Sequence, residues 1–223
     1  KYSLSAWSDK WLLRFNPTKW IVMPVWHNLN TRYFMREGAG PMELQVVTEE
    51  KDLGVLFTED LKLGRQCMAA AAKASKIIGL VRRNFRDLDK RDFLLIYKTY
   101  IRPHLEYCVQ AWSPYLEKDM DMLERVQRSA TRLLSGFAKY SYEERLRRLG
   151  ITTLRKRRER GDLIEVYKIM SGKEKIDKTQ FFHPAKSDYN LRGHSLKIKK
   201  ERSRLDTRKY SFSQRVVNSW NQL

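Results

Sequence analysis

The sequence predicts an α+β protein that is mainly helical. Short apolar runs separated by turn residues occupy the first 57 residues, and apolar residues at helical spacing fill most of the remaining chain. A hydrophobic content of 42% in 223 residues supports a packed core and excludes a wholly disordered basic chain. We expect a small β region over residues 1–57, a helical bundle over residues 58–140, and a basic extension with a β-hairpin over residues 141–223.

The β region is expected to begin with a short helix over residues 4–14, which places Trp7 and Trp11 on one face. Asn16-Pro17 ends that helix, because the residue before a proline disfavours the α conformation. Short apolar runs then predict strands at residues 21–23, 33–35, 44–47 and 53–57. Within the last run, Gly54 indicates a bulge or a close approach of another backbone.

A long helix is expected to begin at Thr58, whose hydroxyl can cap it. Two acidic residues come directly after it and suit the positive end of the helix dipole. The face opposite its apolar residues carries a basic stripe: Lys62, Arg65, Lys73, Lys76 and Arg83. The stripe contains no acidic residue, whereas a merely soluble helix usually mixes charges. We interpret it as a phosphate-binding surface, with an ordinary solvated face as the alternative.

Further helices are predicted from capping residues and apolar periodicity. Asp89, Ser141 and Thr153 are in position to cap helices, and Glu144 gives Ser141 the spacing of a capping box. Pro103 can open another helix. The expected ranges are 89–100, 103–112, 119–135, 141–150 and 153–172. The outward face of the third of these helices carries Arg125, Arg128 and Arg132.

The last long helix has cations crowded in its first turns: Arg155, Lys156, Arg157, Arg158 and Arg160. The helix dipole disfavours cations there, which indicates a negative partner. A nuclear-import signal and ordinary pairing with Glu159, Asp162 and Glu165 are the alternatives.

Beyond this helix, residues 172–188 form the expected linker. Residues 196–199 alternate as a strand does, and residues 210–212 could form the other strand of a hairpin. Ser213 is then expected to cap a short helix that contains Trp220.

The net charge of +19 is unevenly distributed. The first 60 residues carry 7 basic and 8 acidic residues, residues 61–140 carry 16 and 8, and residues 141–223 carry 22 and 10. A basic excess of this size favours a polyanionic partner, most commonly nucleic acid. A basic protein on a membrane surface is disfavoured, since no helix places exposed Trp or Phe beside its basic face. We expect the extension to contact nucleic acid through Arg155, Arg157, Arg158, Arg192, Lys197 and Lys199.

No catalytic or metal centre is predicted. The four histidines are far apart without a metal-ligand neighbour at helical spacing, and no phosphate-binding glycine loop is present. Cys67 and Cys108 are too few for a disulfide scaffold and are interpreted as small buried residues. Without a signal peptide or a 20-residue apolar run, we expect an intracellular protein, in a nuclear or cytoplasmic ribonucleoprotein. The first residue, Lys1, suggests a chain cut from something longer.

Several motifs in one order resemble a known family. The first three are Trp7-Ser8-Asp9-Lys10-Trp11 with Phe15-Asn16-Pro17-Thr18-Lys19, then Glu50-Lys51-Asp52-Leu53-Gly54-Val55, then residues 97–108 with Gln110-Ala111-Trp112. The order continues in residues 123–128, 160–163, 192–195 and 215–220. Together they resemble the C-terminal portion of non-LTR (LINE-type) retrotransposon reverse transcriptases, of the jockey and chicken-repeat kind. The resemblance covers nearly the whole chain.

The resemblance implies a role for each region. Residues 1–57 would end a polymerase palm, in which Asn16 and Lys19 match the motif after the catalytic aspartates and Leu53, Gly54 and Val55 match the primer grip. Most relatives have Cys at the position of Trp20, which puts the local packing in doubt. The helices after Thr58 would form the thumb, and the rest an extension that helps to bind RNA or target DNA.

The family also implies which parts lie elsewhere. Its enzymes use Mg²⁺ held by palm aspartates, which are expected upstream together with the fingers and an endonuclease domain. This chain alone is therefore expected to bind no cofactor and to be inactive, and its partners are expected to be an RNA template and a DNA primer or target. A decayed or co-opted copy that acts as a protein-interaction module, or has no function, is the alternative.

Overall fold

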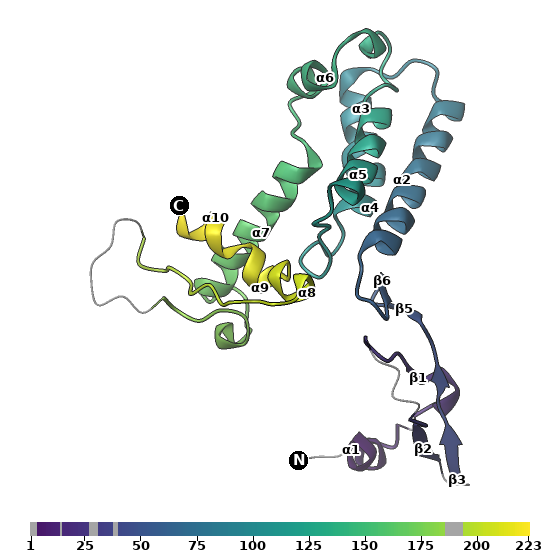
Figure 1. Ribbon diagram of the computed structural model, residues 1–223. Coiled ribbons are helices and arrows are strands. Elements are labelled where there is room, and N and C mark those ends of the chain that lie inside the picture. Colours follow the sequence, from purple (N-terminus) through teal and green to yellow (C-terminus); the bar gives the residue numbers. More distant parts are fainter. Residues whose placement is uncertain (1–3, 14, 27–30, 38–39, 186–193) are drawn as a thin grey trace. The chain divides into compact units, whose positions relative to one another are not determined.

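The computed structural model describes residues 4–13, 15–26, 31–37, 40–185 and 194–223. The chain divides into two compact units, Lys1–Lys62 and Leu63–Leu223, which we call unit 1 and unit 2 (Figure 1). The predicted class is confirmed: the protein is mainly helical α+β, and its two-stranded sheets lie in unit 1. The boundary between the units lies a few residues after the expected one at Thr58.

Unit 1 contains small pieces of secondary structure. Strand β1 pairs in parallel with β4, whereas β2 with β3 and β5 with β6 form antiparallel pairs. The elements are α1 (Leu4–Trp11), the 3₁₀ turn η1 (Pro17–Lys19), β1 (Ile21–Val22), β2 (Phe34–Glu37), β3 (Gly40–Glu43), β4 (Gln45–Val46), β5 (Glu49–Asp52) and β6 (Val55–Thr58). Each pair is short, so this unit has little area over which a sheet could bury a core.

The β5–β6 hairpin corrects the interpretation of residues 53–57. Leu53 and Gly54 form its two-residue turn, with φ values of 44° and 88°, and the strand begins only at Val55. A turn with two positive φ angles matches the right-handed twist of paired strands, and glycine adopts such a φ at no steric cost. Gly54 therefore makes the turn rather than the predicted bulge.

Unit 2 is a helical bundle followed by a C-terminal segment packed on its last long helix. The helix α2 packs against α4 and α5, and α10 packs against α7 (Figure 1). The helices are α2 (Gly64–Asn84), α3 (Lys90–Ile96), α4 (Arg102–Glu106), α5 (Glu117–Ala130), α6 (Tyr142–Leu149), α7 (Leu154–Met170), α8 (Asp206–Lys209), α9 (Phe212–Arg215) and α10 (Val217–Asn221).

The long helix α2 begins at Gly64, six residues after the predicted cap at Thr58. The Thr58 hydroxyl instead donates to the Asp60 carboxylate at 2.8 Å, and the same carboxylate accepts from the Lys62 backbone N–H at 3.0 Å. These bonds hold a turn. At the helix start, an Asp119 oxygen from α5 lies 3.5 Å from the Cβ position of Gly64. An anion supplied by another helix thus complements the dipole of α2.

The two helices predicted after Asp89 form one nearly continuous segment. A π-helical turn, η2 (Tyr97–Ile101), joins α3 to α4 and accommodates Pro103, which has no N–H to donate. The segment ends at Glu106, short of the predicted Trp112. Cys108 then lies in a turn with φ 53° and is exposed, so the prediction that both cysteines are buried is correct only for Cys67.

The predicted local caps are confirmed at three helices. Asp89 accepts from the N–H of Asp92 at 2.7 Å, Ser141 from that of Glu144 at 3.2 Å, and Thr153 from that of Lys156. Each bond satisfies one of the N–H groups that a helix start leaves without a partner. The helix predicted over residues 119–135 ends earlier in the structure, because α5 stops at Ala130.

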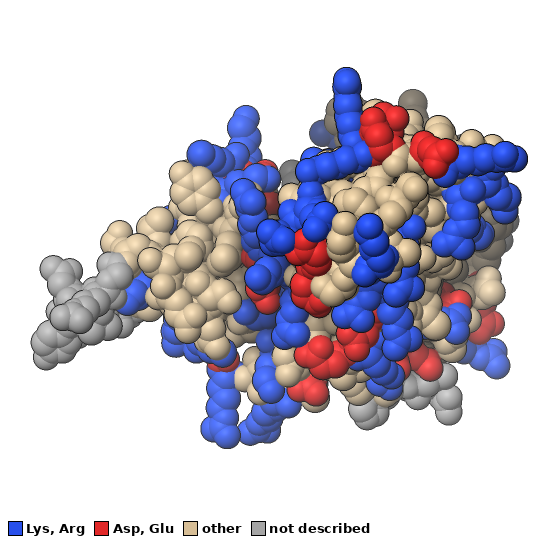
Figure 2. Space-filling model, turned by 90° about the horizontal axis from the view of Figure 1, so that it is seen from above, with Lys and Arg blue, Asp and Glu red and all other residues tan. Residues whose placement is uncertain are grey.

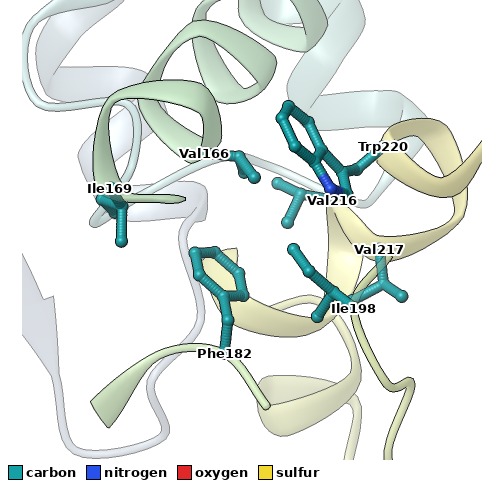
Figure 3. Packing of buried hydrophobic residues seen from close by; sticks show 7 residues of the cluster. All are labelled: Val166, Ile169, Phe182, Ile198, Val216, Val217 and Trp220. Carbon is teal, nitrogen blue, oxygen red and sulfur yellow. The ribbon is translucent and has the colours of Figure 1, made fainter. Parts of the chain in front are cut away.

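A separate apolar cluster fastens the C-terminal segment to α7 (Figure 3). Its buried members are Val166, Ile169, Phe182, Ile198, Val216, Val217 and Trp220. Asn221 also brackets Ile198, accepting from its N–H at 2.9 Å and donating to its carbonyl at 2.8 Å. The segments around Phe182 and Ile198 are thereby joined to the last helices.

The prediction that residues 196–199 pair with residues 210–212 in a hairpin is wrong. Ile198 forms an isolated antiparallel bridge with Pro184, whereas Tyr210 ends α8 and stacks on Tyr115 at 4.3 Å between ring centroids. Ser213 was expected to begin a helix, but Ser211 precedes α9 and Ser213 is buried within it.

Candidate nucleic-acid interface

The outward face of α2 carries the predicted basic stripe. Lys73, Lys76 and Arg83 are exposed, and within the part of the chain that the structure describes no carboxylate forms an ion pair with them. Arg65 is exposed on the same helix. The buried residues of α2, which include Cys67, Ala70, Ala74, Ile78 and Val81, face the bundle. The helix therefore presents a row of cations on a rigid, anchored support.

Lys62 does not belong to this row. It precedes α2, lies in unit 1, and pairs with Asp60 at 2.9 Å. Hydrogen bonds from Lys62, with a further one from Thr58, lower the pKa of Asp60 to about 2. The stripe predicted from helical periodicity thus loses its first member, because the helix begins later than expected.

The basic start of α7 is largely occupied by contacts within the protein. Arg155 lies 3.3 Å from a Glu117 oxygen and 3.8 Å from Glu159, and Arg157 forms a two-pronged pair with Glu106. Contact with Glu106 raises the pKa of Arg157. The alternative of pairing with Glu159, Asp162 and Glu165 accounts only for the contact of Arg155 with Glu159, since Arg157 pairs with the distant Glu106.

Arg158 corrects the predicted interface most clearly. It is only 6% exposed, donates to the Leu105 carbonyl at 2.7 Å and stacks over Trp112 at 5.3 Å. Burial lowers its pKa. A guanidinium in this position supports the bundle and does not face a ligand on the surface.

The other predicted residues of the extension are spread apart. Arg192 lies outside the described residues. Lys197 is half-buried and Lys199 is exposed, one on each side of buried Ile198. The alternation predicted over residues 196–199 holds only around Ile198, since Leu196 is 42% exposed, and only an isolated bridge forms.

The residues matched to polymerase motifs lie in unit 1. The Asn16 side chain accepts from the backbone N–H of Thr18 at 3.1 Å and from its hydroxyl at 2.6 Å, and Lys19 is exposed. Leu53, which is 83% exposed, and Gly54 lie at the hairpin tip, whereas Val55 is buried. Asn16 and Lys19 thus lie in a capped turn, and Leu53, Gly54 and Val55 lie in a hairpin.

One basic row was noted in the sequence but not assigned to the interface. Arg125 and Arg128 follow the outward side of α5, and Arg132 lies just beyond its end; all three are exposed and form no ion pair with any carboxylate in the described ranges. The Arg128 guanidinium rests 4.9 Å from the ring centroid of Tyr142 on α6. The i, i+3, i+7 spacing of the three arginines was the available signal.

On the face drawn in Figure 2, lysine and arginine side chains are spread widely, with acidic side chains among them. The acid-free row is therefore a local feature of α2 rather than part of a uniform positive surface, and on α5 the exposed Asp121 lies one turn before Arg125 on the same face. Contacts of this kind neutralise phosphates without reading bases.

A cavity of about 400 Å³ lies between α5, α7 and the C-terminal segment. Asp162 and Arg215 on its wall form a two-pronged pair at 2.8 and 2.9 Å, and Arg215 also donates to the Val109 carbonyl at 3.0 Å. Its charged walls are mostly tied to one another, which indicates a structural junction rather than a reaction centre.

In the described ranges, no group of three or more His, Cys, Asp or Glu residues could hold a metal ion. The Mg²⁺ implied by the family resemblance thus finds no fitting set of ligands in the described ranges. None of the helices in the described ranges is long and apolar enough to cross a membrane. Comparison with models of protein families, with curated proteins and with solved structures gives no match.

Proposed function

We propose that this chain is the nucleic-acid-binding part of an RNA-directed DNA polymerase of the non-LTR retrotransposon kind. The observation that carries the proposal is the row of Lys73, Lys76 and Arg83, exposed on a 21-residue helix and without a carboxylate partner in the described ranges. The ordered motifs of the sequence supply the class of enzyme. The ligand is a duplex of RNA template and DNA primer.

In this proposal α2 contacts the sugar–phosphate backbone. Lysine and arginine on one helix face release condensed counterions when they neutralise phosphates, so affinity falls steeply as salt rises. Contacts of this type position a duplex and carry no sequence information. A polymerase requires such contacts, because it must hold every sequence that it copies.

Unit 1 would contribute to the same ligand through its hairpin. The exposed tip of Leu53 and Gly54 is shaped to lie against the end of a primer strand, and Lys19 offers an exposed cation in the same unit. These assignments rest on the family resemblance, and the chemistry of nucleotide addition is assigned to residues outside this chain.

Binding of an RNA–DNA hybrid tests the proposal. The wild-type chain should shift the hybrid in a gel, and reversing three charges in Lys73→Glu, Lys76→Glu and Arg83→Glu should weaken binding on the order of 10- to 100-fold at low salt. The loss should be the same for unrelated sequences. Absent or salt-insensitive binding by the wild type would refute the proposal.

The matched control reverses three exposed lysines outside the helix: Lys173→Glu, Lys175→Glu and Lys178→Glu. Both variants change the net charge equally, so long-range attraction changes equally. If the control loses as much affinity as the α2 variant, the contact is not at α2.

The exposed aromatic residues of unit 1 favour the second candidate, a co-opted protein-interaction module. Trp7, Trp11 and Trp26 are 46%, 58% and 52% exposed. Apolar groups in water are typical of surfaces that other proteins cover. A partner that remains bound in a pull-down after nuclease treatment, and is lost in Trp11→Ala, would support this candidate.

A further inference from the structure

The corner where α5 leads into α6 holds a buried cation without a counterion. Arg145 is 2% exposed, and its guanidinium donates to the Thr131 hydroxyl at 3.0 Å and to the Tyr140 carbonyl at 3.0 Å. Both acceptors are neutral, and no carboxylate of the described residues pairs with it. These two hydrogen bonds to neutral groups leave the charge uncompensated, which is a costly arrangement in a folded protein.

The groups around Arg145 add positive charge. Arg128 and Arg145 both lie against the ring of Tyr142, at 4.9 and 5.7 Å from its centroid. Burial and the proximity of Arg132 and Arg128 lower the pKa of Arg145, and Glu143 only partly opposes this. Arg132 and Arg128 thus add positive charge near the buried Arg145 at one corner of the bundle.

The support of this corner is rigid. The Tyr142 hydroxyl donates to the Glu124 carboxylate and accepts from the side-chain amide of Gln127 at 2.7 Å. Gln127 is itself buried, and accepts from Tyr97 while donating to the Thr152 carbonyl at 3.0 Å. Because the ring that carries Arg128 is fixed at its hydroxyl, the cation is held in place before any ligand arrives.

We propose that the exposed Arg128 and Arg132, beside the buried Arg145, form a phosphate-binding corner, which takes a backbone phosphate of the same nucleic acid as a contact additional to α2. This inference rests on the proposed function. Arg125 lies one turn before Arg128 on the same face of α5, so the exposed cations continue along the helix beyond the corner. An oxyanion here would supply the counterion that the described protein groups do not give to Arg145.

Two measurements on variants of Arg128 and Arg132 test the corner. The double variant Arg128→Gln, Arg132→Gln should bind the RNA–DNA hybrid with a dissociation constant roughly tenfold higher than that of the wild type. The slope of the logarithm of its binding constant against the logarithm of salt concentration should become shallower by about two. Hybrid binding with an unchanged slope would overturn the inference. The control is Arg147→Gln, an exposed α6 arginine already paired with Glu144 at 2.7 Å, which should leave the slope unchanged.

Stability of the free protein provides the second measurement. Arg132→Gln alone should raise the melting temperature in the absence of nucleic acid, because it relieves repulsion on Arg145 while removing no ion pair within the described chain. A surface arginine with a purely stabilising role would lower it. A fall in melting temperature for Arg132→Gln therefore counts against the corner.

The source of the phosphate is distinguished by two ligands. Inorganic phosphate should raise the melting temperature of the wild type only weakly, whereas the hybrid should raise it at micromolar concentration. Equal effects at equal phosphate concentration would mean that the corner binds a free anion and would overturn the assignment to a strand. If the wild type binds no hybrid at all, the proposed function is refuted. The melting temperature of Arg132→Gln then still measures the repulsion between Arg132 and Arg145 on its own.

Discussion

Unit 1 and unit 2 differ in how completely they bury their apolar side chains. Unit 2 buries large side chains completely, among them Phe93, Trp112 and Leu123. In unit 1 Val55 is the one buried hydrophobic residue among those described, while Trp11 and Leu12 are 58% and 89% exposed. Apolar burial is the main favourable term in folding, so unit 2 contains the source of its own stability and unit 1 does not.

The sharpest test of this contrast removes one aromatic side chain from each unit. Phe93→Ala should destabilise unit 2 by about 3 to 5 kcal/mol, because it opens a cavity in a packed core. Trp11→Ala should change the free energy of unfolding by less than about 0.5 kcal/mol, since most of its ring is already in water. Urea unfolding followed by helical circular dichroism measures both. Equal losses would contradict the contrast.

A second prediction concerns the charged junction inside unit 2. Arg215→Met leaves the Asp162 carboxylate in a largely buried site without its partner, and should cost about 3 kcal/mol. Arg208→Met is the control, because its pair with Glu201 is exposed and should be worth under about 1 kcal/mol. The same urea experiment applies. A loss for Arg208→Met as large as that for Arg215→Met would show that burial does not decide the cost.

The helix cap at Thr153 should have a smaller effect. Thr153→Ala removes the acceptor for the Lys156 N–H at the start of α7, at an expected cost of about 1 kcal/mol. Thr153→Ser keeps the hydroxyl and should retain most of that stability. Differential scanning calorimetry compares the three proteins. A Ser variant as unstable as the Ala variant would indicate lost packing instead of a lost cap.

The smallest expected effect is the acid response of unit 1. The pKa of Asp60 is about 2 in the folded chain against 3.8 for an unperturbed aspartate, because Lys62 and Thr58 donate to its carboxylate. The stability from these bonds is therefore complete above pH 3.8 and is lost as the pH falls toward 2. An NMR titration should place the Asp60 inflection near 2. An inflection near 3.8 would mean that the turn is not formed in solution.

Local chemistry could be predicted from the sequence. Asp89, Ser141 and Thr153 cap helices as expected, because a cap depends on residues within three positions along the chain. Helical periodicity likewise predicts the basic stripe on α2, with the exception of Lys62, which precedes the helix.

Features that depend on distant residues could not be predicted. The start of α2 is complemented by Asp119 from another helix, and the burial of Arg158 depends on Trp112 and Leu105, some fifty residues away. The pairing of Ile198 with Pro184, instead of with residues 210–212, is likewise decided by packing against α7. The basic run at the start of α7 looked like an interface because its partner Glu106 lies 51 residues away in the chain.

The contacts of Arg215 have a consequence for the order of folding. Its guanidinium joins its own segment to Asp162, 53 residues earlier, and to the Val109 carbonyl, 106 residues earlier. Closing the loop of 106 residues to Val109 costs more entropy and is slower than packing α2 against α5, whose contact between Gly64 and Asp119 spans 55 residues. We therefore expect the bundle to assemble first and the Arg215 contacts to form late, so that Arg215→Met mainly accelerates unfolding and leaves the folding rate nearly unchanged.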